Sequence, residues 1–239
     1  MSEWWTYTLR DFLLFSPRTY YRLFEIYNAA IWPAQIVALG LGLTILALLR
    51  RGGAARARLI AGILSGCWLW VAIAFHATRY ATINTVAVSF AWAFGLEAAL
   101  LIWTGVVRGR LTFERPADPA SRAGLWIFLF ALAIEPLVGP VLQRGWRQVE
   151  IFGMAPDPTA VATLGILLLV TGRGRWTLMI IPAIWCAITG ATLLAMKAPD
   201  AWIPPLAALL AVWLTVRQWR AARRFGRVES SEAARAASP

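Results

Sequence analysis

The sequence has few of the side chains on which haem, retinal and metal chemistry depend. It contains one histidine, His76, and one lysine, Lys197. A haem held by two histidines, or a metal site with several imidazoles, cannot be built from this chain alone. The lysine lies between the last two apolar runs and so cannot form a retinal Schiff base in the last one. Nucleotide-binding P-loops, GxSxG elbows and HExxH motifs are also absent from the sequence. We therefore expect neither a cofactor nor an enzymatic activity.

Charged residues are also scarce, at 15% of the chain, whereas hydrophobic residues make up 59% and the mean hydropathy is +0.62. No soluble core of this size needs so much apolar material. At about 20 residues per crossing, the apolar runs predict an all-α, polytopic membrane helix bundle. Its seven transmembrane helices are expected at about residues 29–49, 59–78, 84–107, 123–142, 158–171, 176–196 and 201–219. The fifth is short for a ~30 Å layer unless it extends toward Ile151 or is shielded by its neighbours.

The arginines predict the orientation. Assigned loop by loop, sixteen lie on the side of the C-terminus and the first, third and fifth loops, against seven basic residues on the other side. By the positive-inside rule, the N-terminus is outside and the C-terminus is cytoplasmic. We therefore expect the net charge of +11 to reflect arginines that interact with anionic lipids at the cytoplasmic face. We expect no nucleic-acid partner.

Residues 1–28 are expected to form an aromatic, amphipathic segment on the outer face. Ser16 and Pro17 are typical of a helix N-cap and first position. The residues that follow divide into an aromatic face (Tyr20, Leu23, Phe24 and Tyr27) and a charged face (Arg18, Arg22 and Glu25). This interfacial helix either anchors the first span or covers an outward-facing cavity.

At the other end of the chain, residues 29–219 form the predicted transmembrane domain. Residues 220–239 read as a basic and then disordered cytoplasmic tail, because their apolar content is too low for a core.

Two glutamates fall inside predicted spans, where an ionisable group is a candidate for function. They are Glu97 and Glu135. Glu135 is followed by Pro136 and Pro140, which cannot donate backbone hydrogen bonds, so a broken helix with free carbonyls is expected there. Such a site would suit a proton or a cation. The alternative is a protonated carboxyl that ties two helices together.

A third cluster lies at the outer end of the second span, in "FHATRYATIN". His76, Arg79 and Tyr80 are spaced to share a helical face. With Arg22 and Glu25 on the same side of the membrane, they are expected to line one polar, aromatic pocket. Interfacial anchoring by Arg79 and Tyr80 is the alternative.

The stretches "LLFSPRTYYRLFEIYN", "FHATRYATIN" and "FAWAFGLE" resemble a family of bacterial multi-pass membrane proteins with no assigned function, some of which carry the label permease. The resemblance implies an integral protein of the bacterial inner membrane and transfers no site residues. We expect a permease for a small solute or for protons. The alternative is a non-catalytic membrane subunit or assembly factor with a membrane-protein partner, and a homo-oligomer is also open.

The charge distribution generates a topological prediction. Green fluorescent protein fused to the C-terminus should fluoresce in the cytoplasm, and alkaline phosphatase fused at the same point should be inactive. Paired fusions in the loop around Lys197 serve as the control and should give the reverse pattern. An active phosphatase at the C-terminus would contradict the predicted orientation.

Overall fold

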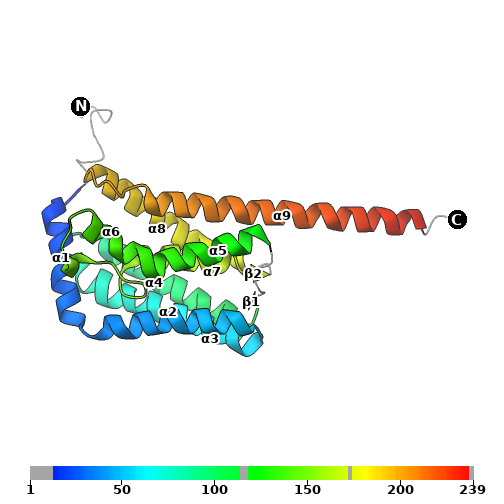
Figure 1. The fold of residues 1–239 in the computed structure, drawn as a ribbon, viewed down its shortest axis with the longest axis horizontal. Helices are drawn as coiled ribbons and strands as arrows, with labels where there is room; N and C mark the ends of the chain where they lie inside the picture. The colour runs from blue at the N-terminus through cyan, green and yellow to red at the C-terminus, as the bar shows by residue number, and fades with distance from the viewer. Residues whose placement is uncertain (1–12, 114–117, 172–173, 237–239) are drawn as a thin grey trace.

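The computed structural model describes residues 13–113, 118–171 and 174–236, and almost all of them are helical (Figure 1). The α-helices are α1 (Pro17–Ile31), α2 (Ala34–Arg51), α3 (Ala54–Trp70), α4 (Ala87–Leu101), α5 (Pro119–Leu129), α6 (Glu135–Val141), α7 (Pro156–Leu167), α8 (Arg175–Ala195) and α9 (Ile203–Ala236). The all-α class predicted from the sequence is thus observed in the described residues.

Several helices continue into turns of different width. Wider π-helical turns follow α3, α4 and α5, at Val71–Ala77, Ile102–Val107 and Phe130–Ile134. Tighter 3₁₀ turns occur at Tyr80–Thr82 and Trp146–Gln148. π-helical turns change the direction in which later side chains point and are frequent at functional sites.

The loops gather at two opposite ends of the bundle. At one end, strand β1 (Thr112–Phe113) pairs antiparallel with β2 (Val170–Thr171), and Arg175 donates a hydrogen bond to Gln218 of α9. We call this the arginine-rich end. At the opposite end α1 lies across the bundle, near α6 (Figure 1). We call this the α1 end.

Among the described residues, five helical segments are long and apolar enough to cross a membrane: α2, α3 with its continuation, α4 with its continuation, α5 through α6, and α8. They correspond to five of the seven predicted spans. The predicted fifth span is instead the 12-residue α7. At 1.5 Å per residue it is ~18 Å long, too short to cross by itself.

The predicted seventh span is part of α9, which continues far past Trp219 to Ala236. It includes the basic segment and most of the tail that the composition predicted to be disordered. Alanine, arginine and glutamate, which dominate this stretch, are all good helix formers. In Figure 1 α9 extends beyond the rest of the bundle.

The short helix α7 forms the centre of the bundle. All 12 of its residues are buried, and it contacts α3, α5, α8 and α9. α5 approaches it closely, because a Cβ atom on Gly165 would lie 2.7 Å from the Gly124 carbonyl oxygen. Small residues that permit such close crossings are typical of helices packed within membranes. A helix that is apolar all round, as α7 is after its first turn, requires this complete coverage.

The predicted amphipathic helix is α1. The Ser16 hydroxyl accepts a hydrogen bond from the Thr19 backbone N–H at 3.1 Å, and Pro17 occupies the first turn. Its buried face consists of Tyr20, Leu23, Phe24 and Tyr27, the four residues predicted from the spacing. α1 therefore packs an aromatic face against the end of the bundle.

Candidate functional site: an acidic cavity at the start of α7

α7 begins inside the bundle. Its C-terminal end leads into β2 at the arginine-rich end, so its ~18 Å length places Pro156 well short of the other side of a ~30 Å apolar layer. The chain reaches this point through residues 143–155, here called the inward segment, which is non-helical apart from the turn at Trp146–Gln148. Irregular backbone at this depth is tolerated only where other protein groups or water satisfy it.

Side chains of α1 donate hydrogen bonds to several backbone carbonyl groups of the inward segment. The Tyr27 hydroxyl donates to the Met154 carbonyl at 2.9 Å. The Asn28 amide donates to the Arg147 and Val149 carbonyls at 2.9 and 2.8 Å. The aromatic helix that the sequence placed on the surface thus also holds the inward segment in position.

The last turn before α7 depends on Gly153. Its φ of +77° is in the left-handed region, and a Cβ there would lie 2.9 Å from the Cys67 sulfur. Both the conformation and the space therefore favour glycine. The Gly153 N–H donates to the Thr159 hydroxyl at 2.9 Å, which in turn donates to the Ala155 carbonyl at 2.6 Å.

Asp157 lies in the first turn of α7 and is 4% exposed. Its two carboxylate oxygens accept hydrogen bonds from Trp185 Nε1 at 2.7 Å and from the Thr189 hydroxyl at 2.9 Å, both on α8. The N-terminus of α7 adds a partial positive charge beside it. The carboxyl group is therefore fixed deep in the bundle.

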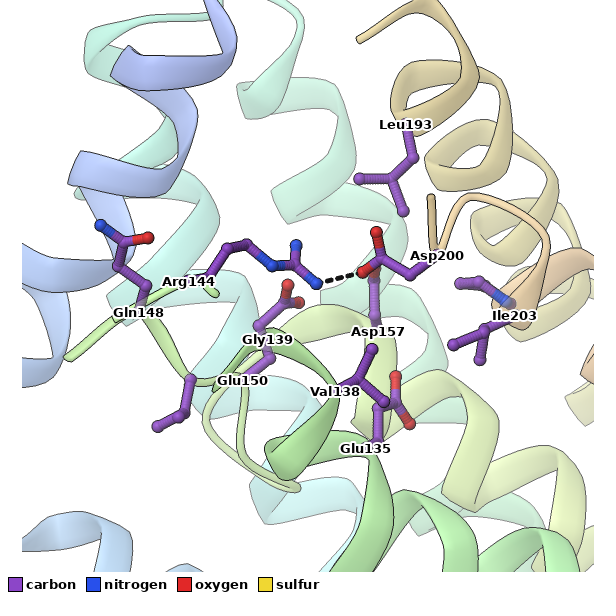
Figure 2. Close-up of a pocket in the computed structure, with 12 residues that line it drawn as sticks. Glu135, Val138, Gly139, Arg144, Gln148, Glu150, Asp157, Leu193, Asp200 and Ile203 are labelled. Atoms are coloured by element: carbon purple, nitrogen blue, oxygen red, sulfur yellow. Dashed lines mark hydrogen bonds and ion pairs between the residues drawn. The ribbon is translucent and has the colours of Figure 1, made fainter. Parts of the chain in front are cut away.

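A small cavity of about 30 Å³ lies beside this carboxyl group. It has room for one or two water molecules, since one needs roughly 10–15 Å³. Its charged lining residues come from separate parts of the chain, as Figure 2 shows. They are Glu135 of α6, Arg144 and Glu150 of the inward segment, Asp157 of α7, and Asp200 of the loop between α8 and α9.

Arg144 is the only basic residue in this lining. Its guanidinium group forms an ion pair with Asp200, whose side chain is 12% exposed (Figure 2). The guanidinium carbon also lies 4.7 Å from the centre of the Tyr21 ring, which favours the charged form through a cation–π contact. Arg144 thus connects α1, the inward segment and the loop before α9.

The other carboxyl groups of the cavity form no ion pair in the described residues. One oxygen of Glu135 and one of Glu150 are covered from solvent and have no hydrogen-bond partner in the described part of the chain. Glu135 also experiences the charges of Asp157, Glu150 and Asp200. The lining contains four carboxyl groups and one guanidinium group, so the fully ionised cavity would have a net charge of −3. Such an arrangement favours the uptake of protons or of a small cation.

The carboxyl groups are not arranged as a metal site. Within the described ranges, no three histidine, cysteine, aspartate or glutamate side chains are close enough together to hold one metal ion.

Of the predicted site residues, Glu135 lies in the cavity. A broken helix was expected at Pro136, but α6 continues through this residue to Val141. A π-helical turn at Phe130–Ile134 precedes it instead. Such a turn skips a backbone hydrogen bond, which accommodates a proline that lacks the N–H. The break comes later, where the inward segment begins.

Glu97 lies elsewhere, on α4. It is fully buried, and neither of its oxygens has a hydrogen-bond partner in the part of the chain that is described. It does not line the cavity.

His76 and Tyr80 lie in an aromatic cluster, and neither of them lines the acidic cavity or the groove that Arg79 lines. The His76 ring is fully buried and contacts Phe94 and Trp185, with ring centres 4.4 and 4.9 Å apart. Tyr80, 4% exposed, stacks on Phe90. The helix ends at Ala77, so the α-helical spacing that predicted a shared face for His76 and Arg79 does not apply.

Arg22 and Arg79 do come together, in a separate groove between α1 and the turn at Tyr80–Thr82. Glu25 is 3.6 Å from Arg22 in a largely exposed ion pair. The residues of the predicted polar pocket are thus divided: Arg22 and Arg79 line the basic groove, whereas His76 and Tyr80 lie in the aromatic cluster.

Sequence reasoning missed four of the five charged residues of the cavity, because Arg144, Glu150, Asp157 and Asp200 were assigned to loops. One signal was available: the apolar stretch "IFGMA" between Glu150 and Asp157 is unusual for a solvated loop.

Comparison with known proteins adds one relationship. Residues 18–225 match a family of unknown function, DUF6064, and the chain belongs to this family. No curated protein and no solved structure matches the chain. The chain is therefore a member of a family of unknown function, and its described helices include several that are long and apolar enough to cross a membrane.

Burial raises the pKa of Glu150 well above its ordinary value of 4.5. The Asp157 carboxylate raises it further, the Arg144 guanidinium opposes the shift, and Asp200 adds to it. The folded protein therefore holds the Glu150 proton more tightly than the unfolded chain does. The stability that this group contributes is fully present below the unfolded pKa and is lost as the pH rises toward the folded pKa.

We predict that Glu150→Gln changes the pH dependence of stability. The thermal midpoint of the purified wild type should fall as the pH rises from about 5 to about 8, and the variant should lose less. Each unit of the pKa shift corresponds to about 1.4 kcal/mol, or a few degrees. Glu25→Gln is the control, because its ion pair is exposed. Parallel pH profiles for wild type and Glu150→Gln would contradict the assignment.

Proposed function

We propose that the protein is a small permease of the bacterial inner membrane that carries protons, alone or coupled to a small solute, through the acidic cavity. The observation that carries this proposal is the surplus of carboxyl groups around a hydratable cavity at the N-terminus of a helix that begins inside the bundle. Transporters commonly place their binding sites at such discontinuous helices.

The size of the cavity favours protons as the transported species. About 30 Å³ is far below the 300–1,000 Å³ of ordinary small-molecule pockets. A larger solute would need the cavity to widen. The inward segment and the loop at Asp200 have the least regular structure of the lining, so these are the parts that would move.

We also propose the full topology. The five apolar segments, with α7 shielded at the centre and α9 completing the bundle, make seven passes or partial passes with the N-terminus outside. The acidic cavity then lies toward the outside, and the arginine-rich end faces the cytoplasm and its anionic lipids.

A second candidate is a membrane subunit or assembly factor. The observation in its favour is α9, which extends beyond the bundle at the arginine-rich end (Figure 1). A projecting basic helix could bind a membrane-protein partner or a second copy of this chain. Co-purification in mild detergent, followed by mass spectrometry, distinguishes this role.

Proton flux into liposomes tests the transport proposal. Protein reconstituted with an internal pH-sensitive dye should dissipate an imposed pH gradient faster than empty liposomes do. Glu135→Gln preserves size and hydrogen bonding but cannot carry a proton, so it should lower the protein-dependent rate at least about tenfold.

Glu97→Gln is the matched control, because Glu97 is a buried carboxyl outside the cavity, and it should retain most of the flux. Wild-type flux in Glu135→Gln would remove this residue from the mechanism. No protein-dependent flux in the wild type, across a range of pH and candidate solutes, would favour the subunit.

A further inference from the structure

The groove between α1 and the turn that follows α3 is distinct from the acidic cavity. Its volume is about 350 Å³, within the range of small-molecule sites. Three arginines line it: Arg18 and Arg22 from α1, and Arg79 from the loop before the Tyr80–Thr82 turn. They are joined by an apolar set (Leu23, Ile26 and Ile83) and by two threonines (Thr19 and Thr82).

The positive charge of the groove is largely uncompensated. Arg22 has Glu25 as a partner at 3.6 Å, and Arg22's own side chain is 65% exposed. Arg18 and Arg79 form no ion pair in the described residues. Three arginines against one glutamate leave a net charge of +2. The threonine hydroxyls already bond Ser16 and the Arg79 carbonyl, so the guanidinium groups are the main donors offered to a ligand.

The spacing on α1 explains why these groups converge. Arg18, Arg22 and Ile26 follow one another at intervals of four residues, so they form one stripe along the helix. This stripe flanks the buried aromatic face that holds α1 against the bundle. Because that face fixes the helix, the arginines are presented from a rigid support.

The groove also lies where lipid headgroups are expected. Trp32, directly after α1, is 67% exposed, and Trp146 of the inward segment is 70% exposed. Exposed tryptophans at the end of an apolar bundle mark the headgroup region. Ile26 is 48% exposed at the groove, an apolar surface beside cationic groups at the level where acyl chains meet headgroups.

We propose that this groove binds one anionic phospholipid, with its phosphate on Arg18, Arg22 and Arg79 and the start of its acyl chains on Leu23, Ile26 and Ile83. Guanidinium groups bind phosphate oxygens in a bidentate fashion. The net positive charge selects an anionic headgroup over a zwitterionic one, and the apolar side favours a lipid over a free phosphate ion. This proposal does not depend on proton transport.

Native mass spectrometry of the detergent-purified protein tests it with defined lipids. The wild type should bind one phosphatidylglycerol at least about tenfold more tightly than one phosphatidylcholine. Arg18→Gln/Arg79→Gln should remove this preference. The control is Arg147→Gln, which removes an exposed arginine of the α1 end that does not line the groove, and it should behave as the wild type.

Two results would overturn the proposal. One is equal phosphatidylglycerol binding by the wild type and a folded double variant, with folding checked by circular dichroism. The other is full displacement of the lipid by millimolar inorganic phosphate, which would make the groove a site for soluble anions. If the double variant does not fold, Arg79→Gln alone should lower the preference several-fold, and an unchanged preference contradicts the lipid site.

Discussion

The structure depends on one constraint: polar backbone and carboxyl groups inside an apolar bundle must be covered and paired. α7 starts within the bundle, so the inward segment brings unpaired carbonyl groups with it. Tyr27 and Asn28 of α1 bond three of these carbonyls, and Trp185 and Thr189 of α8 bond Asp157. The position of α1 across the end of the bundle and the complete burial of α7 both follow from this requirement.

The acidic cavity brings together several groups that do not meet this constraint. Glu135, Glu150 and Asp200 each leave one oxygen without a hydrogen-bond partner in the described chain, whereas the unpaired carboxyl group of Glu97 lies by itself on α4. Arg144 compensates one carboxylate, Asp200, and is itself held by Tyr21. An apolar side chain in place of such a buried, unpaired carboxyl group would stabilise the folded protein. The presence of an acidic residue at this position therefore fits a role in binding protons. The basic groove lined by Arg18 and Arg79 lies at the same end, and there we propose that α1 also binds a lipid.

The sequence predicts the elements defined by local chemistry. Ser16 and Pro17 mark the start of α1, the spacing of its aromatics gives the buried face, and apolar length locates the five described segments that are long enough to cross a membrane. It predicts Glu135 but not its partners, since Glu150, Asp157 and Asp200 come from three separate segments that only the fold brings together. It also places His76 beside Arg79, because α-helical spacing was applied where the helix widens and ends. Apart from the apolar stretch "IFGMA" before Asp157, such long-range and non-α features left no signal in this sequence.

The central claim is that the cavity at the start of α7 is hydrated while the rest of the α7 packing is dry. Radiolytic hydroxyl-radical footprinting tests this directly, because it labels side chains next to ordered water. Leu193 lines the cavity although it is only 4% exposed, and Leu164 of α7, which is 0% exposed, does not line it. The account predicts that Leu193 is labelled at least several-fold faster than Leu164. Equal, background-level labelling of both leucines would contradict it.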